Sequence, residues 1–140
     1  MDAGGRCRVS AASGSNPLGY SAPIWARFRQ APRAGRFDPA TPGLAVGQAG
    51  TRASDSVLRL ELVVEAGRIA DARFQAYGCP ASIAVGAWLA EAAIGQTPSR
   101  LNELRARDLV DALEIPEDRL HCALMGEDAL RAALQAIGVQ

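Results

Sequence analysis

The residues with the most reactive chemistry in this sequence are its cysteines and its only histidine. LHCALMGED, at residues 120–128, places His121 directly beside Cys122. A second cysteine, Cys79, lies in YGCPAS, and the third is Cys7. Thiolate and imidazole are common ligands of zinc and iron, and a thiol next to an imidazole can also act as a nucleophile with its base. The alternative is that His121 and Cys122 are two ordinary core residues.

Cys79 precedes Pro80 and an apolar stretch that is typical of a helix. Proline suits the first helical position, because the N–H that it lacks would have no partner there. Cys79 is therefore expected to be the N-cap, with its sulfur near unpaired backbone N–H groups and the positive end of the helix. That position favours the thiolate, which is the reactive and metal-binding form. A small buried apolar side chain remains the alternative for a free cysteine.

Cys122 is expected near the start of the last helix. Glu127 and Asp128 suit an early helical turn, and Pro116 ends the preceding helix. Adjacent side chains point in different directions on a regular element, so a direct proton pair between His121 and Cys122 is disfavoured. From a loop, the two could still converge on one metal ion.

The clearest predicted element is a β-hairpin. VLRLELVV at 57–64 alternates apolar and polar residues, and RIADARFQAY at 68–77 returns after a tight turn. Leu58, Leu60, Leu62 and Val64 are expected on one buried face, with Arg59 and Glu61 on the opposite one.

The remaining periodic segments predict helices. The first covers 21–31, with Ser21 as N-cap and Ile24, Trp25 and Phe28 on one face. Further helices are expected at 80–95, 107–115 and 123–138, with Gly95 ending the first of these. Strands followed by segregated helices indicate the α+β class, with helices packed on a small antiparallel sheet.

Composition sets the broad limits. We expect a disordered tail over residues 1–19, which includes Cys7, and one domain over 20–140. The formal net charge is zero, so no overall field attracts nucleic acid or an acidic membrane.

No apolar run is long enough to span a membrane and no secretory signal is evident, which makes the cytoplasm the expected location. All 15 basic residues are arginine, which excludes lysine-based chemistry such as a Schiff base.

Taken together, the segments resemble the NifU/IscU family of iron–sulfur cluster assembly scaffolds. YSAPIWARFRQAPRAGRFD is similar to that family's opening helix and loop, and VLRLELVV with GRIADARFQAYGC to its strand pair and central cysteine segment. LHCALMGEDALRAAL is similar to its third cysteine segment and closing helix. The likeness runs in order from Tyr20 to about Ile137, which is more specific than any single motif.

The resemblance implies an α+β domain with a sheet of about three strands, and a site at one end of it. In that family a cysteine desulfurase delivers persulfide sulfur, iron binds, and a [2Fe–2S] cluster forms and passes to recipient apo-proteins. Carried over, Cys79 matches the second family cysteine, and His121 and Cys122 match the His-Cys pair. Cys122 would be the persulfide acceptor.

The first family cysteine has no counterpart here. Ser54 stands at its position and Ser56 at the position of the family's aspartate, with Asp55 between them. Asp55 could supply a carboxylate, although a slip of one residue along a strand points to the opposite face. Cys79, His121 and Cys122 would supply three of the four ligand positions of a [2Fe–2S] cluster, which would then be labile. Zn²⁺ could use the same three with Asp55 or water.

The segment IPEDR before His121 is a second departure. The family's Leu-Pro-Pro-Val-Lys is recognised by a specialised Hsp70 chaperone, and here Glu117 and Asp118 replace its Pro and Val while Arg119 replaces its Lys. Two added negative charges put that partner in doubt.

Three hypotheses follow. The first is a divergent scaffold or carrier, and the second is a module that binds metal or regulates a desulfurase without holding a cluster. The third, an enzyme using Cys122 and His121 as nucleophile and base, lacks any oxyanion-hole signature, and we expect no enzymatic activity.

Overall fold

The computed structural model describes residues 19–51 and 55–138. Its described elements follow one another along the chain as α1 (Ala22–Gln30), β1 (Leu44–Thr51), β2 (Ser56–Glu65), β3 (Arg68–Tyr77), α2 (Pro80–Ala93), α3 (Pro98–Leu101), α4 (Ala106–Leu113), the 3₁₀ turn η2 (Glu117–Arg119) and α5 (Leu120–Ile137). The predicted α+β class is confirmed. The expected tail over residues 1–19, with Cys7, lies almost wholly outside the described residues.

A three-stranded antiparallel sheet forms the base of the domain, in the order β1-β2-β3. The predicted hairpin is β2 and β3, joined through Ala66 and Gly67, which both have positive φ. Such φ values belong to the tight turns that match the twist of a hairpin. Strand β1 was not predicted, because its residues, LAVGQAGT, are mostly small and lack the bulky alternation that marks a strand.

The second face of the sheet is not simply solvent-exposed, which corrects the expectation for Glu61. This carboxylate is 1% exposed and accepts hydrogen bonds from the Phe37 N–H (2.8 Å) and Arg59 Nε (2.7 Å). Burial alone raises the pKa of the Glu61 carboxyl, but these donors and Arg36 outweigh it and hold the pKa below its usual range. The chain before β1 therefore passes across this face.

The expected apolar row on β2 is confirmed. Leu58, Leu60 and Leu62 are fully buried, and Val64 is partly buried and packs against the same core. The register shifts between Val63 and Val64, where the extra residue of the β-bulge is Ala70 on β3.

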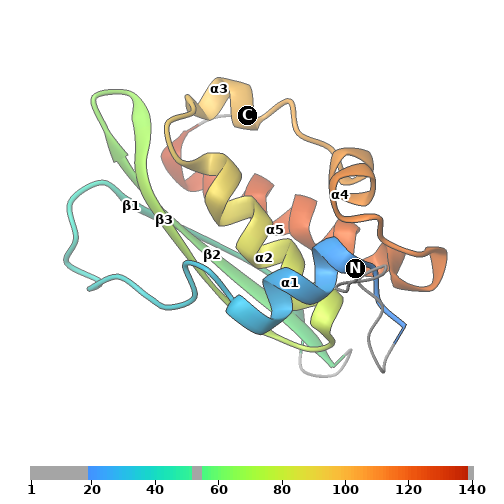
Figure 1. Ribbon diagram of the computed structural model, residues 1–140. Helices are drawn as coiled ribbons and strands as arrows, with labels where there is room; N and C mark the ends of the chain where they lie inside the picture. Colours follow the sequence, from blue (N-terminus) through green and yellow to red (C-terminus); the bar gives the residue numbers. More distant parts are fainter. Residues whose placement is uncertain (1–18, 52–54, 139–140) are drawn as a thin grey trace, which may run out of the picture.

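Two helices, α2 and α5, lie on the other face of the sheet, with α1 packed on α2 and α4 on α5 (Figure 1). The predicted first helix is α1, with Ser21 as its N-cap, although only Ile24 of its expected apolar face is fully buried. Trp25 and Phe28 contact each other at its surface, with ring centroids 5.3 Å apart. The predicted helices at 80–95 and 107–115 correspond to α2 and α4, and the short α3 was not predicted.

The last helix begins earlier than expected, at Leu120 rather than at residue 123. The expectation that Glu127 belongs to an early turn is wrong, because it lies in the middle of α5. Its carboxylate accepts a hydrogen bond from the Ala106 N–H at 2.7 Å, and thereby satisfies a free donor at the start of α4. His121 and Cys122 consequently lie in the first turn of a helix and not in a loop.

Three glycines let the backbones approach closely at the core of this arrangement. A Cβ at Gly47 of β1 would lie 2.2 Å from the Ala129 oxygen and 2.2 Å from the Ala133 nitrogen of α5. A Cβ at Gly86 of α2 would lie 2.4 Å from the Phe74 ring. A Cβ at Gly126 of α5 would lie 2.4 Å from the Val85 side chain of α2. The positions of α2 and α5 on the sheet therefore depend on these residues having no side chain.

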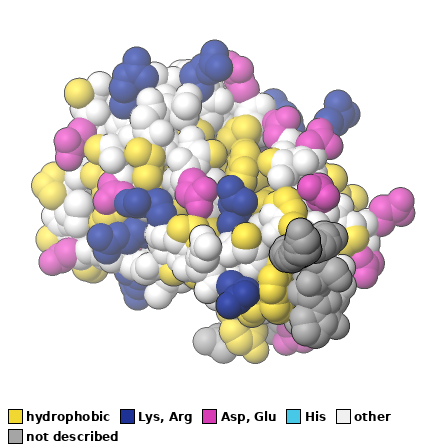
Figure 2. Space-filling model, viewed as in Figure 1, with side chains coloured by type: hydrophobic (Ala, Val, Ile, Leu, Met, Phe, Trp, Pro, Cys, Tyr) yellow, Lys and Arg dark blue, Asp and Glu magenta, His cyan; other side chains and the backbone are white. Residues whose placement is uncertain are grey.

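Acidic and basic side chains are interspersed over the face shown in Figure 2, in keeping with the zero net charge. Within residues 19–51 and 55–138, no helix is both long enough and apolar enough to cross a membrane.

Replacing Gly47 by alanine is expected to destabilise the domain by about 1–3 kcal/mol, the usual cost of overpacking, because the new methyl group meets the backbone of α5. Urea unfolding measures the change in free energy. Gly67→Ala is the control, since nothing lies within 4 Å of a Cβ at Gly67 and its cost comes only from its φ of +77°. Equal losses for the two variants would contradict the close packing of α5 on β1.

Candidate functional site

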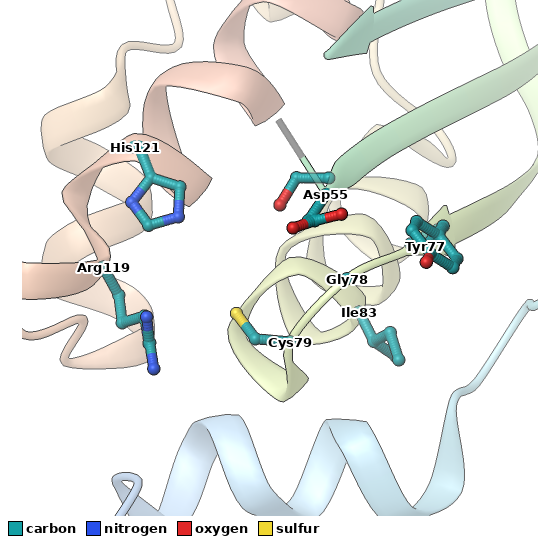
Figure 3. Close-up of a pocket in the computed structure, with 9 residues that line it drawn as sticks. Asp55, Tyr77, Gly78, Cys79, Ile83, Arg119 and His121 are labelled. Carbon is teal, nitrogen blue, oxygen red and sulfur yellow. The ribbon is translucent and has the colours of Figure 1, made fainter. Parts of the chain in front are cut away.

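A surface pocket of about 670 Å³ opens at the end of the sheet where β3 leads into α2. Its walls come from the turn before β2, the end of β3, the start of α2 and the start of α5. Figure 3 shows His121 and Arg119 on one side of this space, with Cys79 and Asp55 on the other. The lining residues are Asp55, Ser56, Ala76, Tyr77, Gly78, Cys79, Ile83, Arg119 and His121.

Cys79 is the N-cap of α2, as predicted, and it is half-buried in the pocket wall. The chain reaches this position through Gly78, whose φ is +147°. A Cβ on Gly78 would lie 3.0 Å from the Ser82 hydroxyl and 3.1 Å from the Ser56 hydroxyl. The turn from β3 into α2 therefore requires glycine before the cysteine.

Cys122 lies in the first turn of α5 and is completely buried. Its Sγ is 3.6 Å from the Sγ of Cys79, although the two residues are 43 positions apart in sequence. The structure thus brings together the two cysteines that the sequence analysis singled out, at the adjacent starts of α2 and α5.

Ser82 is a third member of this cluster and was not predicted from the sequence. Its hydroxyl is fully buried, 3.4 Å from the Cys122 sulfur and 3.7 Å from the Cys79 sulfur. A polar side chain in the apolar first half of the helix, three residues after a capping cysteine, was the available signal.

The two thiols strongly affect each other's ionisation. A hydrogen bond from the Cys122 thiol lowers the pKa of the Cys79 thiol, and the backbone N–H groups of Ser82 and Ala81 add to this effect. The same contact with Cys79, together with burial, raises the pKa of the Cys122 thiol. The pair therefore shares one proton, with the negative charge on Cys79 at the start of a helix and the proton retained on Cys122.

His121 lies on the pocket wall but is exposed, while its neighbour Cys122 is buried. Their opposite directions confirm that adjacent residues on a helix diverge. Among the described residues, no hydrogen bond joins His121 to Cys122, so the contact between nucleophile and base that the enzyme hypothesis requires is not formed.

Asp55 also lines the pocket, and the objection that a one-residue slip would turn it away does not apply. It lies before β2 in a turn, with φ of +59°, so the alternation of a strand does not fix its direction. Ser56, at the family's aspartate position, is 8% exposed and lines the pocket as well. Ser54, at the position of the missing cysteine, lies outside the described residues.

Three of the four expected metal ligands, Cys79, His121 and Asp55, line one pocket, and Cys122 lies behind its wall in contact with Cys79. Within the described ranges, no three His, Cys, Asp or Glu side chains converge closely enough to hold one metal ion. Two sulfurs are in contact, whereas His121 and Asp55 occupy separate parts of the wall (Figure 3). Metal binding at all four residues would require His121 and Asp55 to move toward the sulfurs.

The segment before α5 adds a positive charge to the pocket. Arg119 lines the wall, and its guanidinium lies 5.8 Å from the centre of the Tyr20 ring. Glu117 and Asp118 are exposed, and Ile115 is 7% exposed within the core. The acidic residues of this segment therefore face solvent while its arginine faces the pocket.

The fold and the pocket define a class: small α+β domains in which two helices start beside each other at one end of an antiparallel sheet, each with a cysteine in its first positions. The family model of NifU-like N terminal domains matches residues 19–138. This chain belongs to the NifU-like N-terminal domain family, which confirms the resemblance seen in the sequence.

Named relatives agree with this assignment. The chain is 30% identical over 118 residues to the iron-sulfur cluster assembly scaffold protein IscU of Escherichia coli K12, a match that covers 84% of this chain and 92% of that protein. The protein of the same name in Azotobacter vinelandii is 29% identical over 119 residues, with 84% and 93% covered.

Solved structures support the same fold. SufU from Fervidobacterium islandicum AW-1 superposes with a TM-score of 0.67 at 19% identity, covering 82% of this chain and 96% of that one. The N-terminal part of a NifU-like protein from Brucella abortus gives 0.66 at 20% identity, with 83% and 92% covered. At these identities the likeness concerns the fold alone.

Alkylation should distinguish the two thiols at pH 6. An ordinary thiol with a pKa near 8.5 is almost wholly protonated there, so we expect iodoacetamide to label Cys79 and to leave the buried Cys122 unmodified. In Cys122→Ala the hydrogen bond that lowers the pKa of Cys79 is lost, and labelling of Cys79 at pH 6 should slow by roughly tenfold. Peptide mass spectrometry gives the rates, and equal labelling of both cysteines in the folded wild type would refute this ionisation pattern.

Proposed function

We propose that this chain is an iron–sulfur cluster assembly scaffold or carrier. It accepts sulfane sulfur from a cysteine desulfurase at the Cys79–Cys122 pair, and it binds iron or a labile [2Fe–2S] cluster as cargo. The proposal rests chiefly on one observation: the 3.6 Å contact between two sulfur atoms beside an open pocket that His121 and Asp55 also line. Family membership and the names of the relatives support it.

The available ligand set explains why the cargo would be weakly held. Iron in [2Fe–2S] clusters is bound mainly by thiolates, with imidazole as the usual substitute. Here Cys79, Cys122 and His121 would bind the cluster, with the Asp55 carboxylate completing the set. A carboxylate is a harder ligand than a thiolate, and the pocket is open to solvent, so exchange of the cargo would be easy.

The assignment of Cys122 as the persulfide acceptor, which the family resemblance implies, stays a prediction. Scaffold activity requires only that one thiol of the pair carries sulfur while iron is bound nearby.

A second candidate is a binding module that holds zinc, or that regulates a desulfurase without carrying a cluster. The unassembled ligand set and the serine at position 54 favour it. Zinc accepts four-coordinate sites with Cys, His and Asp ligands, so metal analysis separates it from iron.

The partners expected of a scaffold are a cysteine desulfurase and recipient apo-proteins. A specialised Hsp70 chaperone is a weaker candidate, since Glu117 and Asp118 present exposed negative charge where the family's recognition segment is apolar.

Anaerobic reconstitution with iron, cysteine and a cysteine desulfurase tests the proposed function. The wild type should develop visible charge-transfer absorption, with iron and acid-labile sulfide in the protein fraction. Both should be lost in Cys79→Ala and in Cys122→Ala, because each variant removes one of the two neighbouring thiolates. Cys7→Ala is the matched control and should behave as the wild type does.

A colourless protein that nevertheless binds the desulfurase would reject the scaffold in favour of the regulatory module. Bound zinc without sulfide, from protein purified without air, would favour the zinc-binding form of that module.

Replacing Ser54 by cysteine should strengthen the cluster. Ser54 directly precedes Asp55 and stands at the family's first cysteine position, so the substitution restores a thiolate in place of a hydroxyl. We expect slower loss of the visible absorption when an iron chelator is added, with Ser10→Cys as a control for a thiol introduced elsewhere. Equal loss rates would mean that the site differs from the family's by more than this one ligand.

A further inference from the structure

The two sulfur atoms lie at different depths. Cys79 is half-buried and belongs to the wall of the pocket, whereas Cys122 is 0% exposed and does not reach that wall. Because the Cys122 sulfur contacts that of Cys79 at 3.6 Å, it lies behind it as seen from the pocket. A sulfur donor arriving from solvent therefore meets Cys79 first.

We propose that Cys79, not Cys122, takes up the incoming sulfane sulfur, and that Cys122 then resolves the persulfide by releasing sulfide into the pocket. This inference rests on the proposed function, because it requires that the chain receives persulfide sulfur. It assigns different roles to the two cysteines, and it reverses the expectation from the family resemblance for the first acceptor.

The reaction balances without any further reagent. Cys79 attacks the terminal sulfur of a donor persulfide and becomes Cys79–S–SH, while the donor leaves as a thiol. The Cys122 sulfur then attacks the inner sulfur of Cys79, a new S–S bond joins the two cysteines, and the bond to the terminal sulfur breaks. The terminal sulfur leaves as HS⁻, and the proton that the Cys122 thiol gives up converts it to H₂S. The sulfane sulfur gains two electrons, and the two thiols lose them in forming the disulfide.

The geometry favours attack on the inner sulfur. Displacement at sulfur needs the attacking atom and the leaving atom on opposite sides of the sulfur that is attacked. A terminal sulfur on Cys79 would extend into the pocket that Cys79 lines, and the completely buried Cys122 lies on the other side of the Cys79 sulfur. Bond formation requires the two Sγ atoms to close from 3.6 Å to about 2.05 Å, which brings two neighbouring helix starts slightly closer.

The surroundings suit the release of an anion. The Ser82 hydroxyl lies within 3.4 Å of the Cys122 sulfur and 3.7 Å of the Cys79 sulfur, so it can hydrogen-bond to either one as charge moves between them. On the pocket side, Arg119 and His121 line the space into which HS⁻ would leave. The sulfide would thus appear next to His121 and Asp55, where iron would be bound.

The consequence for function is a single round of sulfide release without an external electron donor. The resulting disulfide occupies both thiolates, so a thiol reductant must reopen it before the pair can ligate iron.

Single-turnover loading tests this order. Full-length protein in a Cys7→Ser background is reduced, freed of reductant and treated without air with one equivalent of glutathione persulfide. We expect one equivalent of free sulfide above the protein-free rate, together with one internal disulfide per chain. Fluorescent trapping measures the sulfide, and intact-mass spectrometry after alkylation measures the disulfide.

The single variants assign the roles. Cys122→Ser and Cys122→Ala should both stop at a stable persulfide on Cys79, with sulfide release at the background rate. Cys79→Ser should take up little sulfur, because the remaining thiol is buried. Circular dichroism of each variant checks that it is folded. Two different replacements are made at Cys122, so that a result common to both reflects the loss of the thiol and not a property of the new side chain.

Three results would overturn the inference. A wild type that keeps a stable persulfide and releases no sulfide, or a Cys79→Ser variant that loads Cys122 at the wild-type rate, would reject it and leave the proposed scaffold function standing. No sulfur uptake by any variant, from glutathione persulfide or from a desulfurase with cysteine, would reject both.

Discussion

Close packing of α5 on the backbone of β1 and on α2 is the constraint on which the site depends. It is possible because Gly47 and Gly126 leave room where any side chain would meet neighbouring atoms within 2.4 Å. With α5 held at this distance, its first turn lies beside the first turn of α2, and the sulfur atoms at the two helix starts are in contact. A shift of α5 outward along the sheet would separate them.

Once the thiols are in contact, their chemistry becomes unequal. Two negative charges 3.6 Å apart repel each other, so the pair retains a proton. The negative charge settles on Cys79, which has the backbone N–H groups of a helix start around it and access to the pocket. The proton stays on Cys122, which has no contact with solvent. In the proposed reaction, Cys79 is therefore the residue placed to receive an electrophilic sulfur, and Cys122 lies behind it.

Under the proposed function, the site accommodates the departures of this chain from the family pattern. Ser54 removes one thiolate, but Asp55 reaches the pocket from a turn, and a buried hydroxyl at Ser82 contacts both remaining sulfurs. In the proposed function, this ligand set would be harder and more open, which would suit transient cargo better than a stable cluster. Glu117 and Asp118 add exposed negative charge before α5, while Arg119 places a positive charge at the pocket.

The sequence by itself determined the β2–β3 hairpin, the helix caps at Ser21 and Cys79, the α+β class and the family. These features depend on short-range patterns: alternation along a strand, proline after a cap, and motifs in a fixed order.

Tertiary structure alone decided the rest. The glycine- and alanine-rich β1 is a strand because it pairs with β2 and is covered by α5, and Glu61 is buried because a loop crosses its face. Likewise, the order of depth of Cys79 and Cys122, which are 43 positions apart, and the contact of Cys122 with Ser82 arise where α2 and α5 pack together. Nothing local in either segment encodes that distance.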